Sequence, residues 1–366
     1  MEAPSAQCGE QHRDCSVEIV SEKCYAASSF GTSCVGADEG TMVAADSPPH
    51  LVRCPRSSTW GVGSPHSSMR STMEPTTTDV WTPLPGSPQA RALAHVTQLA
   101  DGPPLDSSLR VTLHFHPDRV CGHVPILAAL AADGLYRSQF ETGISNGWLD
   151  PAPGGSRWRW ESHIFAGAYD DAPPTERPKY GALNYRRRPT GGSTRFGSSH
   201  FRLRSAVLTR CTFCFPDSST KPTRFGVAAR MSLITEAFNA ACDPLDDHIE
   251  AQVHGPVRLA SDVEALVLDP SYRDSEVEAF ARRLPCAVEW HPGFLLSVET
   301  LRQHQSFRGP EFVDLGVAIA RDGYLTPRMI GDAARTGNYE LQNLKKVWHY
   351  LARFGNRAEA SDAVTA

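Results

Sequence analysis

Polar and apolar residues alternate most regularly in "HIEAQVHGPVRL", residues 248–259. Because successive side chains of a β-strand point to opposite faces, this stretch predicts a strand with one polar and one apolar face. The apolar side chains on one face are Ile249, Ala251 and Val253. The other face carries His248, Glu250, Gln252 and His254. The apolar set can be buried in a core, so the polar row indicates a second function for this strand.

Similar patterns predict the remaining elements. Ser87 and Pro88 are typical of a helix start, and Gly134 of a helix end. We expect helices over 88–99, 125–133, 232–241, 275–284 and 340–354, and strands at 109–117, 201–215, 248–259 and 262–269. Residues 135–200 are interpreted as turns around short strands, and 143–195 as a long loop-rich insertion. The predicted fold is α+β: a mainly antiparallel sheet, flanking helices and a helical C-terminal part.

The first 85 residues differ in composition from the rest. They are rich in Ser, Thr, Gly and Pro and lack a sustained helical or strand period. We therefore expect residues 1–85 to be a disordered or wrongly included N-terminal extension. Residues 86–356 are expected to form one α+β domain of catalytic type, and 357–366 a tail.

Composition and charge exclude some partners. The chain has 36 basic and 41 acidic residues, a formal net charge of -5, so no nucleic-acid partner is implied. We see no long apolar run and no signal peptide, and so expect a cytoplasmic protein without a membrane partner. Delivery by a route independent of a signal peptide stays open. Of the ten cysteines, Cys211 and Cys214 form a CxxC pair that alternates like a strand, and reduced thiols are expected.

Three further groups of residues could take part in catalysis or binding. The stretch "LHFHPDR" puts His114 and His116 on one face of a predicted strand. Long segments rich in glycine and aromatic residues, among them Tyr136 and Tyr180, are typical of the wall of a binding site. Two arginine-rich patches, 157–159 and 186–188, could bind phosphates, but we interpret them as solvated surface.

Three functions fit these residues. A metal-dependent hydrolase would use His114, His116, Glu250 and His254 as ligands. Cleavage of the glycosidic bond of nicotinamide would need one carboxylate beside an oxocarbenium-like ribose, a polar anchor on a neighbouring strand and no metal. The third possibility is a non-catalytic effector or binding module, in which the polar strand is structural.

A series of blocks resembles one bacterial family. They include "LHFHPDR", "YRSQFETGISNG", "RPKYGALN", "RFGSSHFRL", "IEAQVHGPV", "LVLDPSY" and "KKVWHYLARFG". Together they are similar to the family called domain of unknown function 3626, over about residues 88–355. This resemblance implies a domain boundary but no activity.

A second resemblance implies a function. The order of a His-bearing strand, "ILAALAADG", "RCTFCFPDS" and "IEAQVHG" is similar to toxins and effectors of the ADP-ribosyltransferase fold. In that fold the late glutamate is catalytic, which implies this role for Glu250, with Gln252 assisting. The first-strand histidine binds the NAD ribose, so His114 or His116 would do so. The middle position is often Tyr or Ser, and the candidates are Tyr136, Tyr180, Ser198 and Ser199.

The chain departs from this pattern at one point. Many arginine-modifying members carry a Glu-x-Glu pair, whereas this chain has Glu250-Ala251-Gln252. The resemblance implies an ADP-ribosyltransferase or NAD glycohydrolase. NAD is the expected substrate, without a metal, and an unknown protein, a small molecule or water the expected acceptor.

Overall fold

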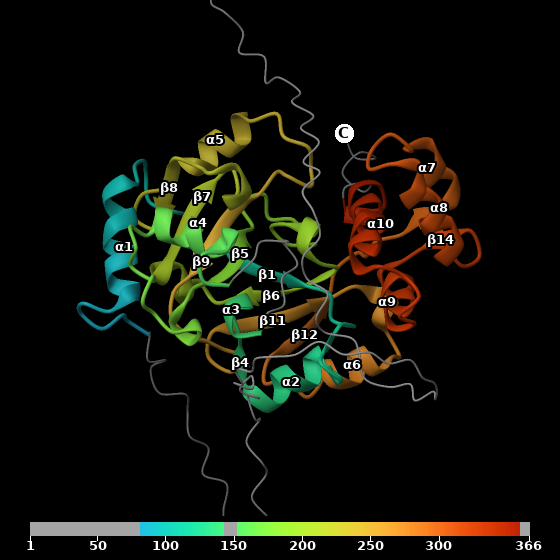
Figure 1. Cartoon of the computed structure of the whole chain (residues 1–366), viewed down its shortest axis with the longest axis horizontal. Helices are drawn as coiled ribbons and strands as arrows, with labels where there is room; N and C mark the ends of the chain where they lie inside the picture. The colour runs from blue at the N-terminus through green and yellow to red at the C-terminus, as the bar shows by residue number, and fades with distance from the viewer. Residues whose placement is uncertain (1–80, 143–151, 359–366) are drawn as a thin grey trace, which may run out of the picture. The chain divides into compact units, whose positions relative to one another are not determined.

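The computed structural model describes residues 81–142 and 152–358. Its centre is an eight-stranded sheet with the order β12-β11-β6-β1-β5-β9-β7-β8 (Figure 1). Every neighbouring pair in this sheet is antiparallel except β11 and β12. The strands are β1 Val111–Phe115, β5 Lys179–Leu183, β6 Ser199–Leu203, β7 Cys211–Phe215, β8 Arg224–Val227, β9 Ile249–Val253, β11 Val263–Leu268 and β12 Ala287–Trp290. A mostly antiparallel sheet with flanking helices confirms the α+β class predicted from the sequence.

Short two-stranded ribbons complete the β-structure of the described residues. The ribbons pair β2 Val120–Cys121 with β3 Val124–Pro125, β4 Leu135–Tyr136 with β10 Val257–Arg258, and β13 Leu296–Ser297 with β14 Tyr324–Leu325. The ribbon of β4 and β10 brings Tyr136 next to the segment that follows β9, because Tyr136 is opposite Val257.

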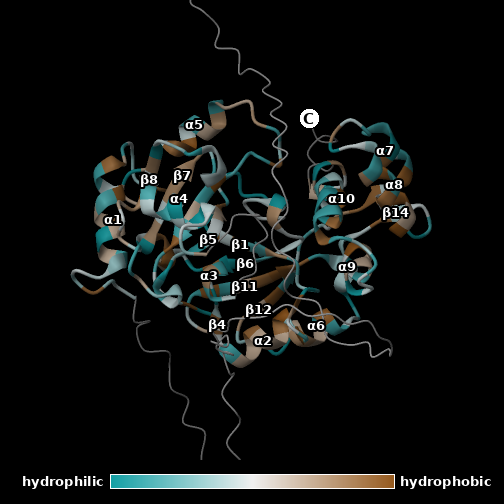
Figure 2. Cartoon of the chain, viewed as in Figure 1, coloured by the Kyte–Doolittle hydropathy of each residue, from teal (hydrophilic) through white to brown (hydrophobic). Residues whose placement is uncertain are grey.

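One face of the sheet packs on the main hydrophobic core. Ile249, Ala251 and Val253 of β9 are fully buried there, as their alternation predicts. Helices α2, Ile126–Asp133, α5, Leu233–Asn239, and α6, Glu276–Ala281, contribute residues to the same core. The apolar residues of β11 and β12 stand out in the middle of Figure 2.

The opposite face carries polar side chains across several neighbouring strands. Residues directly opposite in an antiparallel pair share a face, and Glu250 is opposite both Ala182 of β5 and Cys214 of β7. Gln252 is in the same way opposite Tyr180 and Thr212. The polar row of β9 is thus continuous with polar positions on β5 and β7.

Two helices pack toward the β7 and β8 end of this second face. They are α1, Pro88–Leu99, and α4, Ser156–Ile164. The Ser87 side chain accepts a hydrogen bond from the Ala90 N–H (3.2 Å), which confirms the predicted helix start. Before α1, the Trp81 ring lies under the Arg210 guanidinium at 5.3 Å.

The C-terminal part forms a separate hydrophobic cluster, as the helical pattern of the sequence predicts. Its helices are α7 Val298–Gln303, α8 Pro310–Ile319, α9 Pro327–Arg335 and α10 Leu341–Phe354 (Figure 1). Helix α10 meets the turn 194–196 through Trp348, whose indole N–H donates to the carbonyls of Thr194 (3.1 Å) and Arg195 (3.2 Å). The Trp348 ring also contacts the His116 ring, with centroids 5.0 Å apart. A short helix, α3 Gln139–Thr142, precedes the undescribed segment.

Two predictions of local structure are wrong. The sequence predicts strand throughout 201–215, but a 3-10 helix, Ser205–Arg210, separates β6 from β7. Residues 156–164 were expected to be turns around short strands, but they form helix α4. The buried residues of α4 have helical spacing, yet two of them, Arg157 and Glu161, are charged. A stripe of mixed polarity does not match an amphipathic helix pattern, so the period is hidden in the sequence.

Some expectations fall outside the described residues. Most of the predicted extension 1–85, part of the predicted insertion (143–151) and residues 359–366 are of this kind. No helix in the described part of the chain is both long and apolar enough to cross a membrane.

Candidate functional site

A pocket of about 220 Å³ lies beside β1, β5 and β9. Residues of β1, α2, β4, α3, α4, β5 and β9 line it. It brings together five of the residues singled out in the sequence, namely His114, His116, Tyr136, Tyr180 and Glu250. These residues are up to 136 positions apart in the chain, so the fold alone makes them one site.

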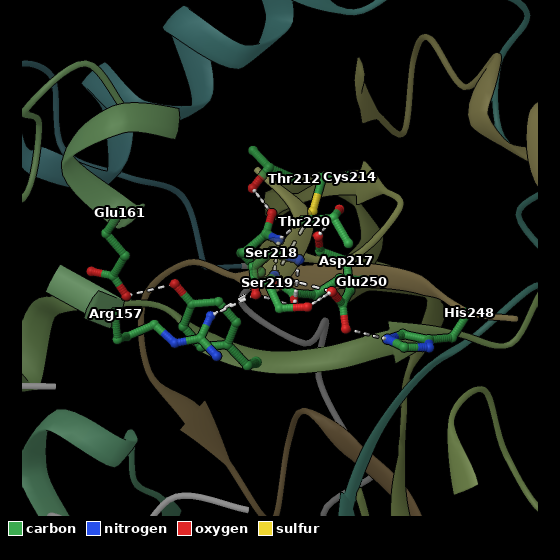
Figure 3. Close-up of polar contacts among 12 residues, drawn as sticks. Arg157, Glu161, Thr212, Cys214, Asp217, Ser218, Ser219, Thr220, His248 and Glu250 are labelled. Carbon is green, nitrogen blue, oxygen red and sulfur yellow. Dashed lines mark hydrogen bonds and ion pairs between the residues drawn. The ribbon is translucent and has the colours of Figure 1, made fainter. Parts of the chain in front are cut away.

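Donors hold both oxygens of the Glu250 carboxylate. Oε2 accepts from the Ser218 hydroxyl (2.7 Å) and the Ser218 N–H (3.3 Å), while Oε1 accepts from the Gln252 amide (3.0 Å). Arg157 Nη1 lies 3.9 Å from Oε1 and donates to the Ser218 hydroxyl at 3.0 Å. Figure 3 shows Ser218 in contact with both the Arg157 side chain and the Glu250 carboxylate. With only 5 % of Glu250 exposed, its orientation is set by these contacts.

Contacts of the neighbouring Asp217 hold the loop that carries Ser218. Asp217 caps the short 3-10 turn Ser218–Thr220 by accepting from the Ser219 N–H at 3.0 Å. Its carboxylate also lies 3.6 Å from Nε2 of His248, the first residue of the polar row (Figure 3). His248 is thus a support for the loop that holds Glu250.

Gln252 lies behind Glu250 and does not line the pocket. Its amide oxygen accepts from Thr212 (2.8 Å), and its amide nitrogen donates to Glu250 and, at 3.4 Å, to the sulfur of Cys214. The side chain is 1 % exposed. These contacts make Gln252 a positioning residue for Glu250, whereas the sequence predicted hydrogen bonds from Gln252 to a ligand.

Arg157 and Tyr180 form the wall beside Glu250. The Arg157 guanidinium stacks 4.0 Å above the Tyr180 ring, and the Tyr180 hydroxyl donates to Glu161 (2.6 Å). Glu161 also accepts from Arg177 (2.7 Å), and burial raises the pKa of Glu161 to about 7. Arg157 is 6 % exposed, so our interpretation of its patch as solvated surface is wrong for this residue. No pattern in the sequence indicates its burial, because the charged residues of α4 hide the helical period.

The two histidines of "LHFHPDR" differ in their contacts. His114 Nε2 accepts from the Ser193 N–H (3.1 Å), and Nδ1 lies 3.5 Å from the Gly197 carbonyl. Burial lowers the pKa of His114 to about 3. The ring nitrogens of His116 meet no hydrogen-bond partner within residues 81–142 and 152–358, and the ring is partly exposed. His116 is therefore the histidine with nitrogens available to a ligand.

The remaining candidate residues also differ in whether they line the pocket. Tyr136 lines the pocket, and burial raises its pKa to about 12. Ser198 and Ser199 lie away from it: the Ser198 hydroxyl is 3.3 Å from the Tyr272 hydroxyl, and the Ser199 hydroxyl accepts from the Asp269 N–H at 3.3 Å. Of these four residues, Tyr136 and Tyr180 line the pocket, whereas Ser198 and Ser199 do not.

The ligand set of the alternative metal site is not assembled. His254 is fully buried, with Nδ1 2.6 Å from the Tyr169 hydroxyl and Nε2 3.0 Å from Thr212 Oγ1. Within the described ranges, no three His, Cys, Asp or Glu side chains gather in a group that could hold a metal ion. The metal-dependent hydrolase has no support from this geometry.

The buried His254 predicts an acid-sensitive fold. Burial lowers its pKa to about 3, whereas an unfolded histidine has a pKa near 6.5. The unfolded state then binds more protons between these values, so the free energy of unfolding falls as the pH decreases from 6.5 toward 3. One such histidine contributes about 1.4 kcal/mol per pH unit.

Urea unfolding at pH 7.0, 6.0 and 5.0 measures this dependence. We expect His254→Gln to lose part of the slope relative to the unsubstituted chain. His95→Gln, at a histidine of α1 outside the buried set, is the matched control. Equal slopes in all three proteins would contradict the prediction.

These features define an α+β protein with a pocket whose wall contains a fixed carboxylate. The model of the family described as "Protein of unknown function (DUF3626)" matches the chain at residues 110–243 and 231–354. The chain belongs to this family, as its sequence blocks indicated. No curated protein matches it.

Proposed function

We propose that this protein cleaves the bond between nicotinamide and ribose in NAD and transfers ADP-ribose to an acceptor or to water. The observation that carries the proposal is the arrangement of three neighbouring strands. β1, β5 and β9 are adjacent, and His116 directly after β1, Tyr180 of β5 and Glu250 of β9 line one pocket. The resemblance to ADP-ribosyltransferases implies the same set: a first-strand histidine, a middle tyrosine and a late glutamate.

The chemistry requires a negative charge near the ribose. When the C1′–N bond breaks, its electron pair goes to nicotinamide, which leaves as a neutral molecule, and positive charge develops on the ribose. A carboxylate fixed in a poorly solvated site stabilises this charge, because its orientation needs no rearrangement during the reaction. Glu250 fits this role, since its donors hold it at the pocket wall. The acceptor atom then bonds to C1′, and its proton passes to solvent.

Other pocket residues suit the rest of the substrate. The nitrogens of His116 can bond a ribose hydroxyl, and the Tyr180 and Tyr136 rings offer surfaces for the nicotinamide. Arg119 also lines the pocket, and nothing in the described part of the chain pairs with its guanidinium. This cation is suited to the diphosphate of NAD.

Nicotinamide release from NAD tests the proposal. The full chain is incubated with NAD and a metal chelator, with and without bacterial protein extract as a source of acceptors, and free nicotinamide is quantified. We expect release that the chelator does not reduce. Labelled ADP-ribose on an acceptor identifies a transferase, and free ADP-ribose a glycohydrolase. A folded, monodisperse protein that releases no nicotinamide with either acceptor would refute the proposal.

A further inference from the structure

A cluster of basic side chains lies outside the pocket, where α10 meets the turn 194–196. We define this basic cluster as Arg195, Arg308, Lys345, Lys346 and His349. Lys345, Lys346 and His349 belong to α10, and the hydrogen bonds from Trp348 hold Arg195 against the same helix. The Arg308 N–H donates to the Tyr350 hydroxyl (3.0 Å), which fixes the fourth cation beside α10.

Most of these charges are not neutralised by the protein. Arg195 pairs with Asp246, and the nearby Asp243 pairs with Arg353 (2.9 Å). The side-chain nitrogens of Arg308, Lys345 and Lys346 have no hydrogen bond or ion pair with any residue the structure describes. Like charges held together without counter-charges cost free energy unless an anion joins them.

His349 is the second, independent observation. Its side chain is 2 % exposed, yet neither Nδ1 nor Nε2 has a hydrogen-bond partner in the described chain. The buried Arg308 Nε also lacks one. Buried polar groups are nearly always hydrogen-bonded, so several unmet groups in one place indicate a missing ligand. Burial, followed by the charges of the four cations, lowers the pKa of His349.

We infer that the basic cluster binds the phosphate group of a small phosphorylated molecule. A phosphate offers several acceptor oxygens, which suits three unpaired cations and an imidazole N–H better than the two oxygens of a carboxylate. The net charge of -5 argues against an extended nucleic-acid surface. The cluster borders the pocket, because Arg195 directly precedes Phe196, a residue of the pocket wall. The inference does not require that NAD be the substrate.

Calorimetric titration with inorganic phosphate, ribose 5-phosphate and ribose tests this inference on the full chain. We expect saturable binding of ribose 5-phosphate and no binding of ribose. Binding of inorganic phosphate alone, without ribose 5-phosphate, would overturn the claim for a phosphorylated molecule. Tighter binding of a single-stranded oligonucleotide than of ribose 5-phosphate would also overturn it, in favour of a nucleic-acid surface.

Matched variants locate the site. Lys345→Ala with Lys346→Ala is expected to weaken binding of ribose 5-phosphate at least about tenfold, since two charge-assisted contacts are lost. Arg258→Ala with Arg302→Ala removes two exposed charges elsewhere and should leave the affinity unchanged. Lys345→Arg with Lys346→Arg keeps the charge and should keep most of the binding. Equal affinities in the alanine variant and its control would refute the assignment, and circular dichroism verifies that each variant folds.

Discussion

Glu250→Gln is expected to lower the rate of nicotinamide release from NAD by about 10²–10³-fold, the usual effect of removing one fixed electrostatic group. The amide has the same size but no negative charge. It also places an NH₂ group where the carboxylate accepts from Ser218 on one side and from Gln252 on the other. One donor then faces another donor, so both the charge and the orientation of the side chain are lost.

The kinetic comparison separates this effect from unfolding. Glu299→Gln, an exposed glutamate of α7, makes the same chemical change away from the pocket and should retain full activity. Thermal unfolding of both variants shows whether the fold is intact. If the folded Glu250→Gln protein releases nicotinamide as fast as the control, Glu250 is not the catalytic carboxylate. If the unsubstituted chain also releases none, the proposed reaction itself is wrong.

Gly197→Ala is expected to reduce the free energy of unfolding by about 3 kcal/mol or more, the upper part of the range for forcing an extra methyl group into a packed site. A Cβ at position 197 would lie 2.3 Å from the carbonyl oxygen and 2.5 Å from the nitrogen of Phe115. Both atoms belong to the backbone of β1, which its neighbours β5 and β6 hold in the sheet. The turn at 194–196 must therefore move, and His114 loses its contact with the Gly197 carbonyl.

Urea unfolding at neutral pH measures this loss. Gly316→Ala is the matched control, because its Cβ would meet the end of the Leu301 side chain (2.7 Å), which can rotate away. We expect a much smaller change in the free energy of unfolding for Gly316→Ala. If Gly197→Ala lowers the free energy of unfolding no more than the small change expected of Gly316→Ala, the turn at 194–196 can shift at little cost and the prediction is wrong.

The sequence predicted the elements whose hydrophobic pattern or end signals lie within a single segment of the chain. The face of β9 and the Gly134 end of α2 follow from the alternation of side chains and from the left-handed conformation that Gly134 adopts (φ 66°). Helix α4 could not be predicted, because charged residues occupy part of its buried stripe. Their burial depends on Tyr180 and Arg177, which lie on other segments.

The candidate site shows the same limit. The sequence singled out Glu250 and the histidines, since unusual residues on a strand face are visible in one segment. It did not show that Ser218 and Arg157 hold the carboxylate. Nor did it show that Gln252 turns away from the pocket, since that depends on Thr212 on the next strand. Such roles arise only when distant segments meet.

The contact between His116 and Trp348 has a consequence for the growing polypeptide. The indole against the His116 ring belongs to Trp348 of α10, which follows His116 by 232 positions in the chain. Domains generally fold as units once their sequence has left the ribosome. The surroundings of the His116 ring can therefore be completed only after α10 has been synthesised. A nascent or truncated chain that ends before α10 contains Glu250, Tyr180 and His116, but the His116 ring lacks its indole neighbour.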